Sequence, residues 1–192
     1  MKRRVVVTGI GALTPIGNNV NDTWKGILNH QCGIDLIQSF DTSNMKVKVA
    51  GELKNFEATE YLDKKDVRKM DKFIQYGLIA AKEAIKDSKL EIDSINHDRF
   101  GVVVSSGIGG LGSIEENHQR GLKKGFDRVS PYFIPMTIVN LAAGQIAIAF
   151  KAQGLATCPV TACAGGTNAI GDAFRNIRDG YLDAVSYTHL RA

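Results

Sequence analysis

The sequence predicts an α/β fold in which the strands of a largely buried sheet alternate with helices. Two observations support this prediction. Continuous apolar runs at Val5–Val7 and Phe100–Val104 each lead into glycine-rich sequence, which is typical of buried strands with tight exits. Elsewhere, apolar residues recur at intervals of three and four, which is typical of amphipathic helices. Strands that alternate with helices indicate helical layers packed on a sheet.

Four elements are expected up to Leu122. Val5–Val7 is expected to be the first core strand. Asp63–Asp87 has the clearest helical period, with one apolar face and an opposite basic face. Phe100–Val104 is expected to be a second buried strand, followed by a short helix at Ser113–Leu122.

The second half continues the alternation. Thr137–Phe150 is apolar nearly all round, which predicts a helix buried on every side. Leu155–Ala162 reads as a strand, and its Pro159 favours an edge position. The helical pattern that follows stops at Gly180, and Tyr181–Val185 is expected to begin another strand.

Composition excludes several classes of protein. Of 192 residues, 44% are hydrophobic and 23% are charged, as in ordinary globular proteins. The net charge of +4 is too small to indicate nucleic-acid binding, and no run approaches the roughly 18 apolar residues of a membrane span. The three cysteines lack CxxC spacing and predict neither disulfides nor a metal site. Cys32 and Cys158 read as small buried residues, and the expected compartment is a reducing cytoplasm.

Cys163 is the candidate catalytic residue. It lies where the apolar run ending at Ala162 changes to a helical pattern, with small residues on both sides. A thiol at a strand-to-helix turn stands near unpaired backbone N–H groups, which favour the thiolate. This position predicts a nucleophile for acyl transfer. A histidine partner is usual for such a thiolate, and His30, His97, His118 and His189 all lack a recognisable catalytic setting.

A glycine-rich loop provides a competing interpretation. The segment Gly107–Gly112 matches G-x-G-x-x-G and follows an expected strand, as in dinucleotide-binding domains. The acidic residue that such domains place about 20 positions later, after a second strand, is missing. Asp127 occurs there instead within a basic loop. Dinucleotide binding therefore stays a remote alternative.

Basic residues form a second candidate surface. Lys64, Lys65, Arg68, Lys69 and Lys72 share the basic face of the first long helix, and Lys123, Lys124 and Arg128 form another basic stretch. Such faces are usually solvated surface, but they can also steer and orient an acidic partner. The residues alone leave both interpretations open.

Several ordered motifs together resemble one family. Between about Arg4 and Val185, the chain is similar to the N-terminal half of the β-ketoacyl-[acyl-carrier-protein] synthases, the condensing enzymes of bacterial fatty-acid elongation. The matching motifs are Val5-Val6-Val7-Thr8-Gly9-Ile10-Gly11-Ala12-Leu13-Thr14-Pro15-Ile16-Gly17, Asp71-Lys72-Phe73, Gly107-Ile108-Gly109-Gly110-Leu111, Ser130-Pro131-Tyr132-Phe133-Ile134-Pro135, Ile138-Val139-Asn140 and Thr161-Ala162-Cys163-Ala164.

The resemblance implies a fold and an assembly. The fold would be thiolase-like, with α-β-α-β-α layers built from two similar halves. This chain would supply mainly the N-terminal half, with a mixed five-stranded sheet and flanking helices. Residues 1–185 would form the domain, and residues 186–192 would be a tail that does not match the family. Full-length members are usually homodimers, in which the strand Leu155–Ala162 would meet its copy across the dimer axis.

The resemblance also implies a role for each matching residue. Cys163 would accept the growing acyl chain as a thioester, Ile108 would line the acyl tunnel, and Phe133 would reach the tunnel of the other subunit. Lys65, Arg68 and Lys69 would face the acidic acyl carrier protein. Decarboxylation of malonyl-carrier and attack on the thioester would then lengthen the chain by two carbons, without cofactor or metal. The Cys163 N–H would help to stabilise the thioester oxyanion.

The sequence departs from this family in two ways. Members are about twice as long, and their two catalytic histidines lie in Ala-His-Gly-Thr and Gly-Gly-His-Asn contexts that do not occur here. The tail Ser186–Ala192 also differs from the family, so the sequence reads as a truncated or mis-assembled reading frame that is inactive alone. Within the resemblance, a polyketide ketosynthase and a non-catalytic chain-length partner are alternatives. Cys163 argues against the second, because such partners usually lack the cysteine.

Overall fold

Strand β3 (Phe100–Ser106) is the centre of a three-stranded parallel sheet. The computed structural model describes residues 3–190, and the side chains as far as Thr188. The sheet order is β4-β3-β5, with β4 at Ala156–Thr157 and β5 at Ala184–Leu190. Every residue of β3 is buried, as its apolar sequence predicts.

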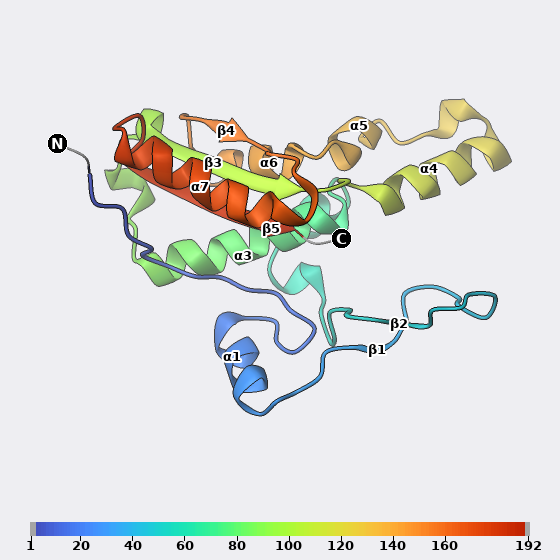
Figure 1. The fold of residues 1–192 in the computed structure, drawn as a ribbon. Coiled ribbons are helices and arrows are strands. Elements are labelled where there is room, and N and C mark those ends of the chain that lie inside the picture. Colours follow the sequence, from blue (N-terminus) through green and yellow to red (C-terminus); the bar gives the residue numbers. More distant parts are fainter. Residues whose placement is uncertain (1–2, 191–192) are drawn as a thin grey trace.

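Helices cover both faces of this sheet (Figure 1). Successive side chains of a strand point to opposite faces. Val102 and Val104 belong to the core cluster formed with α3 (Lys72–Ser88) and α6 (Leu141–Ala149). Ser105 points to the other face, where it meets the first residue of α7 (Gly165–Arg178). The result is the α/β layering that the sequence predicts.

Shorter elements connect these layers. The remaining α-helices are α1 (Val20–Leu28), α2 (Lys64–Val67), α4 (Leu111–Lys124) and α5 (Phe133–Thr137). Single 3₁₀ turns are η1 (Ala58–Glu60), η2 (Ile92–Ser94), η3 (His97–Arg99), η4 (Phe126–Arg128) and η5 (Ala162–Ala164). Within residues 3–190, no helix combines the length and apolarity needed to cross a membrane.

The expected five-stranded mixed sheet is not formed by the described residues. The three-stranded sheet is wholly parallel, and a separate antiparallel pair joins β1 (Asp35–Leu36) to β2 (Val49–Ala50). The expected strand Leu155–Ala162 shortens to the two residues of β4, which lies at the sheet edge as its proline suggested.

The expected first strand, Val5–Val7, is wrong. Residues 3–13 are not in a strand, and Val6 and Val7 are 61% and 64% exposed. The segment instead runs along α3, where the N–H groups of Ile10 and Ala12 donate to carboxylates of that helix. An apolar run forms a strand only when it pairs with a neighbouring strand, and this segment is bound to the side chains of α3 instead.

The expected helix Asp63–Asp87 is divided in two. α2 ends at Val67 and α3 begins at Lys72, because Asp71 adopts an extended conformation and caps α3 through the Phe73 N–H. The expected helix Thr137–Phe150 is also shorter, since α6 spans Leu141–Ala149. It is not buried on every side, because Ile148 is 72% exposed.

The C-terminal tail continues the sheet. Residues 186–190 extend β5 beyond Val185, and β5 pairs with β3 from Phe100↔Ala184 to Ser106↔Leu190. The departure of this tail from the family motifs therefore does not interrupt the strand.

Candidate active site

Cys163 lies at the carboxyl end of the parallel sheet, in the turn that leads into α7. It is the central residue of η5, and its side chain is exposed. α7 is 14 residues long, and no side chain caps its N-terminus. Uncapped N–H groups carry the positive end of the helix dipole, and Cys163 lies two residues before the first residue of this helix. The structure thus gives Cys163 the setting that the sequence predicted for it.

A close contact with the central strand fixes this turn. A Cβ built on Gly165 would overlap the Oγ of Ser105 and lie 3.0 Å from its Cβ. Only glycine lets the first turn of α7 approach β3 so closely. Ala162, directly before Cys163, has a φ of 48°, a left-handed conformation that costs energy for alanine. The thiol is therefore held by a tight and locally strained turn.

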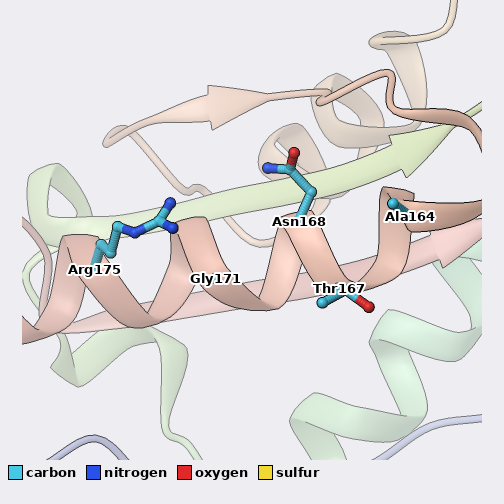
Figure 2. Close-up of a pocket in the computed structure, with 5 residues that line it drawn as sticks. All are labelled: Ala164, Thr167, Asn168, Gly171 and Arg175. Atoms are coloured by element: carbon cyan, nitrogen blue, oxygen red, sulfur yellow. The ribbon is translucent and has the colours of Figure 1, made fainter.

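A shallow groove of about 290 Å³ begins beside this turn and follows α7 (Figure 2). Asn168 and Arg175 lie on the same side of α7, about two helical turns apart. Both bind the carboxylate of Asp172, Asn168 through Nδ2 at 2.8 Å and Arg175 through Nη1 at 3.1 Å. Asn168 and Arg175 are therefore paired with Asp172, and Ala164, Thr167 and Gly171 complete the lining of the groove.

The other two cysteines differ from Cys163 in position. Cys158 is partly buried near the end of β3, and burial raises the pKa of its thiol. A raised pKa keeps this thiol protonated and a poor nucleophile. Cys32 is exposed, which corrects the expectation of a small buried residue, and it follows α1 rather than preceding a helix.

The glycine-rich loop joins β3 to α4 and carries Ile108, which is 53% exposed. Its strand–loop–helix setting matches the dinucleotide-binding pattern, but the N-terminus of α4 is already occupied by an anion. The carboxylate of Asp71 accepts hydrogen bonds from the N–H and the Oγ of Ser113, at 3.2 and 2.6 Å. A pyrophosphate there would face this carboxylate, so the geometry disfavours dinucleotide binding.

Phe133 is the first residue of α5 and is partly buried. The loop of Ile108 and the helix of Phe133 are joined, because the Gly110 N–H donates to the carbonyl of Thr137 at 3.0 Å. The two residues expected to line an acyl chain therefore belong to segments that touch each other.

The basic residues of the expected carrier surface lie around the short helix α2. Lys65 is within it, Arg68 caps it, and Lys69 follows; all three are exposed. Lys69 Nζ lies 3.7 Å from Asp66 and 5.9 Å from the centre of the Tyr132 ring. A second basic region lines a hollow of about 620 Å³ formed by Arg120, Lys124 and Arg128.

The described histidines do not complete the site. His30, His97 and His118, whose side chains are described, make no hydrogen bond to Cys163. His97 lies at the opposite end of β3 from the thiol, and its Nδ1 is buried without a hydrogen-bond partner among the described residues. Within residues 3–190, no group of three His, Cys, Asp or Glu side chains could hold a metal ion.

Sequence reasoning missed three polar residues that hold this region together: Asp71, Ser113 and Asn117. Ser113 and Asn117 are buried, and both lie on α4. Aspartate is a common N-cap residue, but Asp71 lies within the helical pattern of residues 63–87, which hides this signal. Its contact with a serine 42 positions away has no signal in the sequence.

Comparison with known proteins agrees with this geometry. Residues 2–185 match the family described as Beta-ketoacyl synthase, N-terminal domain. The chain is 47% identical over 184 residues to 3-oxoacyl-[acyl-carrier-protein] synthase 2 of Synechocystis sp., and 49% identical over 183 residues to the protein of that name from Staphylococcus aureus. The alignments cover 96% and 95% of this chain, which spans 44% of each of these relatives.

Solved structures show the same fold. A type II polyketide ketosynthase in complex with its acyl-carrier protein superimposes with a TM-score of 0.78 at 28% identity. The ishigamide ketosynthase/chain length factor gives 0.84 at 26% identity. Each comparison covers 95% of this chain and less than half of the other. The thiolase-like fold expected from the motifs is confirmed. The family match over residues 2–185, with which the exposed cysteine before an uncapped helix agrees, shows that this chain belongs to the β-ketoacyl synthase family, as its N-terminal domain.

Proposed function

We propose that this chain supplies the nucleophile-bearing half of a 3-oxoacyl-[acyl-carrier-protein] synthase of fatty-acid elongation. The observation that carries the proposal is the exposed thiol of Cys163 in the turn before the uncapped N-terminus of α7. Relatives of 47–49% identity bear this name, whereas the polyketide structures are 26–28% identical. The higher identity favours fatty-acid elongation over polyketide synthesis.

The chemistry assigned to Cys163 is transthioesterification. Its sulfur attacks the carbonyl carbon of an acyl thioester on the carrier, forming a new C–S bond, and the carrier leaves as its thiol. The tetrahedral intermediate carries negative charge on oxygen, and the backbone N–H of Cys163 is proposed as one donor to that oxygen. The later condensation with malonyl-carrier requires the two family histidines, whose motifs the sequence lacks.

The substrate and partner assignments follow the same proposal. Ile108 and Phe133 would contact the acyl chain, because their segments meet at the carboxyl end of the sheet. Lys65, Arg68 and Lys69 are exposed cations that would meet an acidic carrier protein. β4 is a sheet edge, at which a second copy would add its own β4 in a homodimer.

The test is the intact mass of the purified chain after incubation with a long-chain acyl-carrier thioester. We expect one acyl adduct, retained in Cys32→Ala and Cys158→Ala and lost in Cys163→Ala. Cys32 is the matched control, because it is also exposed but does not precede a helix. Loss of the adduct in Cys32→Ala would identify Cys32 as the acceptor, and equal loading in Cys163→Ala would show that other thiols are acylated; either result would refute the role proposed for Cys163.

A second measurement separates acyl transfer from condensation. With malonyl-carrier added to the acylated chain, we expect no β-ketoacyl product, because the family histidine motifs are missing. Steady formation of that product by the purified 192-residue chain would contradict this assignment of roles.

A further inference from the structure

Asp71 joins two helices that are far apart in the sequence. Its Oδ1 accepts from the Phe73 N–H at 3.2 Å and so caps α3. Its Oδ2 accepts from the Ser113 Oγ at 2.6 Å and from the Ser113 N–H at 3.2 Å, in the first turn of α4. Gly110 precedes α4 and has no side chain to cap it, so the carboxylate of Asp71 takes that place.

The same carboxylate lies close to the glycine-rich loop at Gly110. A Cβ on Gly110 would lie 3.0 Å from Asp71 Oδ2 and would overlap the carbonyl of Met136. The loop is tied again at Gly109, whose N–H donates to Ser106 Oγ at 3.2 Å. Gly109 has a φ of 79°, which favours glycine. The segment that carries Ile108 is therefore held between β3, Asp71 and the end of α5.

The hydrogen bonds continue from Ser113 toward Phe133. Asn117 is 3% exposed; its Nδ2 donates to the carbonyl of Ser113 at 2.8 Å. Its Oδ1 accepts from the Ser130 N–H at 2.9 Å, and Ser130 Oγ accepts from the Tyr132 N–H at 3.1 Å. A buried polar group is costly to leave without a hydrogen bond. The series of hydrogen bonds that joins Asp71, Ser113, Asn117 and Ser130 therefore acts as one unit.

The exposed residues Lys65, Arg68 and Lys69, called the basic segment below, lie next to both ends of this hydrogen-bonded unit. Asp71 follows Lys69 by two residues, and Lys69 Nζ lies 5.9 Å from the ring centre of Tyr132, the residue before Phe133. We infer that Asp71 is a positioning residue: with Ser113 and Asn117, it holds the segments of Ile108 and Phe133 in register with the basic segment, and thereby sets the acyl-chain length that Cys163 accepts. The chain-length part rests on the function proposed above.

The test compares Asp71→Asn with Asp41→Asn in the 192-residue chain. Asparagine keeps an oxygen for the cap of α3 but turns the second acceptor into a donor that faces the Ser113 N–H. Asp41 is the matched control, because its carboxylate also accepts from the N–H and Oγ of one serine, Ser43, both at 2.9 Å, in an exposed loop.

The first readout is amide hydrogen exchange followed by peptide mass. In Asp71→Asn, we expect exchange in residues 107–113 and 130–137 to accelerate by roughly tenfold, the effect of losing a hydrogen bond to a charged acceptor. Exchange in α7 should stay unchanged, and Asp41→Asn should affect neither segment. Unchanged exchange in both segments, or equal acceleration throughout the chain, would overturn the positioning role.

The second readout is the loading of Cys163 by short-chain and long-chain acyl-carrier thioesters. We expect the ratio of long-chain to short-chain loading to change at least threefold in Asp71→Asn and to stay constant in Asp41→Asn. An unchanged ratio with faster exchange would overturn the chain-length role. Absence of any adduct on the parent chain would refute the proposed function and the chain-length role together, while the exchange data would still decide the positioning role.

Discussion

Replacing Gly165 by alanine would place a methyl group where α7 meets β3. The added Cβ would overlap Ser105 Oγ and lie 3.0 Å from Ser105 Cβ, closer than the 3.4 Å at which ordinary contact begins. Ser105 is buried, so the strain must be absorbed by rotating its side chain or by moving the turn that carries Cys163. The substitution therefore tests how the turn that carries Cys163 is held.

The expected magnitude combines two opposing effects. Overpacking of this kind costs about 1–3 kcal/mol, while alanine in a helix gains up to about 1 kcal/mol over glycine. We expect Gly165→Ala to lower the free energy of unfolding by roughly 1–2 kcal/mol. For a chain of this size, that loss lowers Tm by about 2–8 °C.

The assay is thermal and urea denaturation, with Gly171→Ala as the matched control. Gly171 lies in the same helix, and a Cβ there would meet only the guanidinium nitrogens of Arg175, at 3.9 and 4.0 Å. We expect Gly171→Ala to be neutral or stabilising. Adding Ser105→Ala to the Gly165→Ala variant should recover most of the lost stability, because it removes the overlapping Oγ. Equal stability of the two glycine variants would refute the close-contact argument.

Three further predictions concern backbone strain, pH and thiol reactivity. Ala162→Gly should raise stability by up to about 1 kcal/mol in urea denaturation, because glycine relieves a φ of 48°; a loss would contradict the strain. Hydrogen bonds from Arg99 and Arg3 lower the pKa of Asp183 from 3.8 to about 2. Its contribution to the free energy of unfolding is therefore present above pH 3.8 and is lost as the pH falls toward 2. The difference in Tm between the parent and Asp183→Asn should therefore be small, because the site is exposed, and should vanish by about pH 2; a constant difference would oppose this. Cys158 should react with iodoacetamide more slowly than Cys32 at pH 8, because burial raises its pKa, and equal rates would contradict that cause.

Some features could be predicted from the residues because they depend on local order. The apolar run after Arg99 gives β3, and the helical period ending before Gly180 gives α7. Cys163 falls between an apolar run and that helix, so its placement in a turn follows from the sequence alone. The acyl-lining and carrier roles came from the ordered motifs, and they stay proposals.

Other expectations failed because they depend on a neighbour. Val5–Val7 has the composition of a strand, but within the described residues it packs along α3 instead of pairing with a sheet edge. The helical period across residues 63–87 does not show that Asp71 will interrupt it, because the capped start of α3 competes with continuous helix.

The sequence by itself determined the fold class, the family and the place of Cys163 in the turn before a helix, because periodicity and ordered motifs are properties of neighbouring residues. Tertiary structure alone decided which distant groups meet. The contact of Gly165 with Ser105 depends on how close a helix lies to a strand, and the hydrogen bond from Ser113 to Asp71 spans 42 residues. Such distances are set by the packing of the whole core, so no local pattern can contain them.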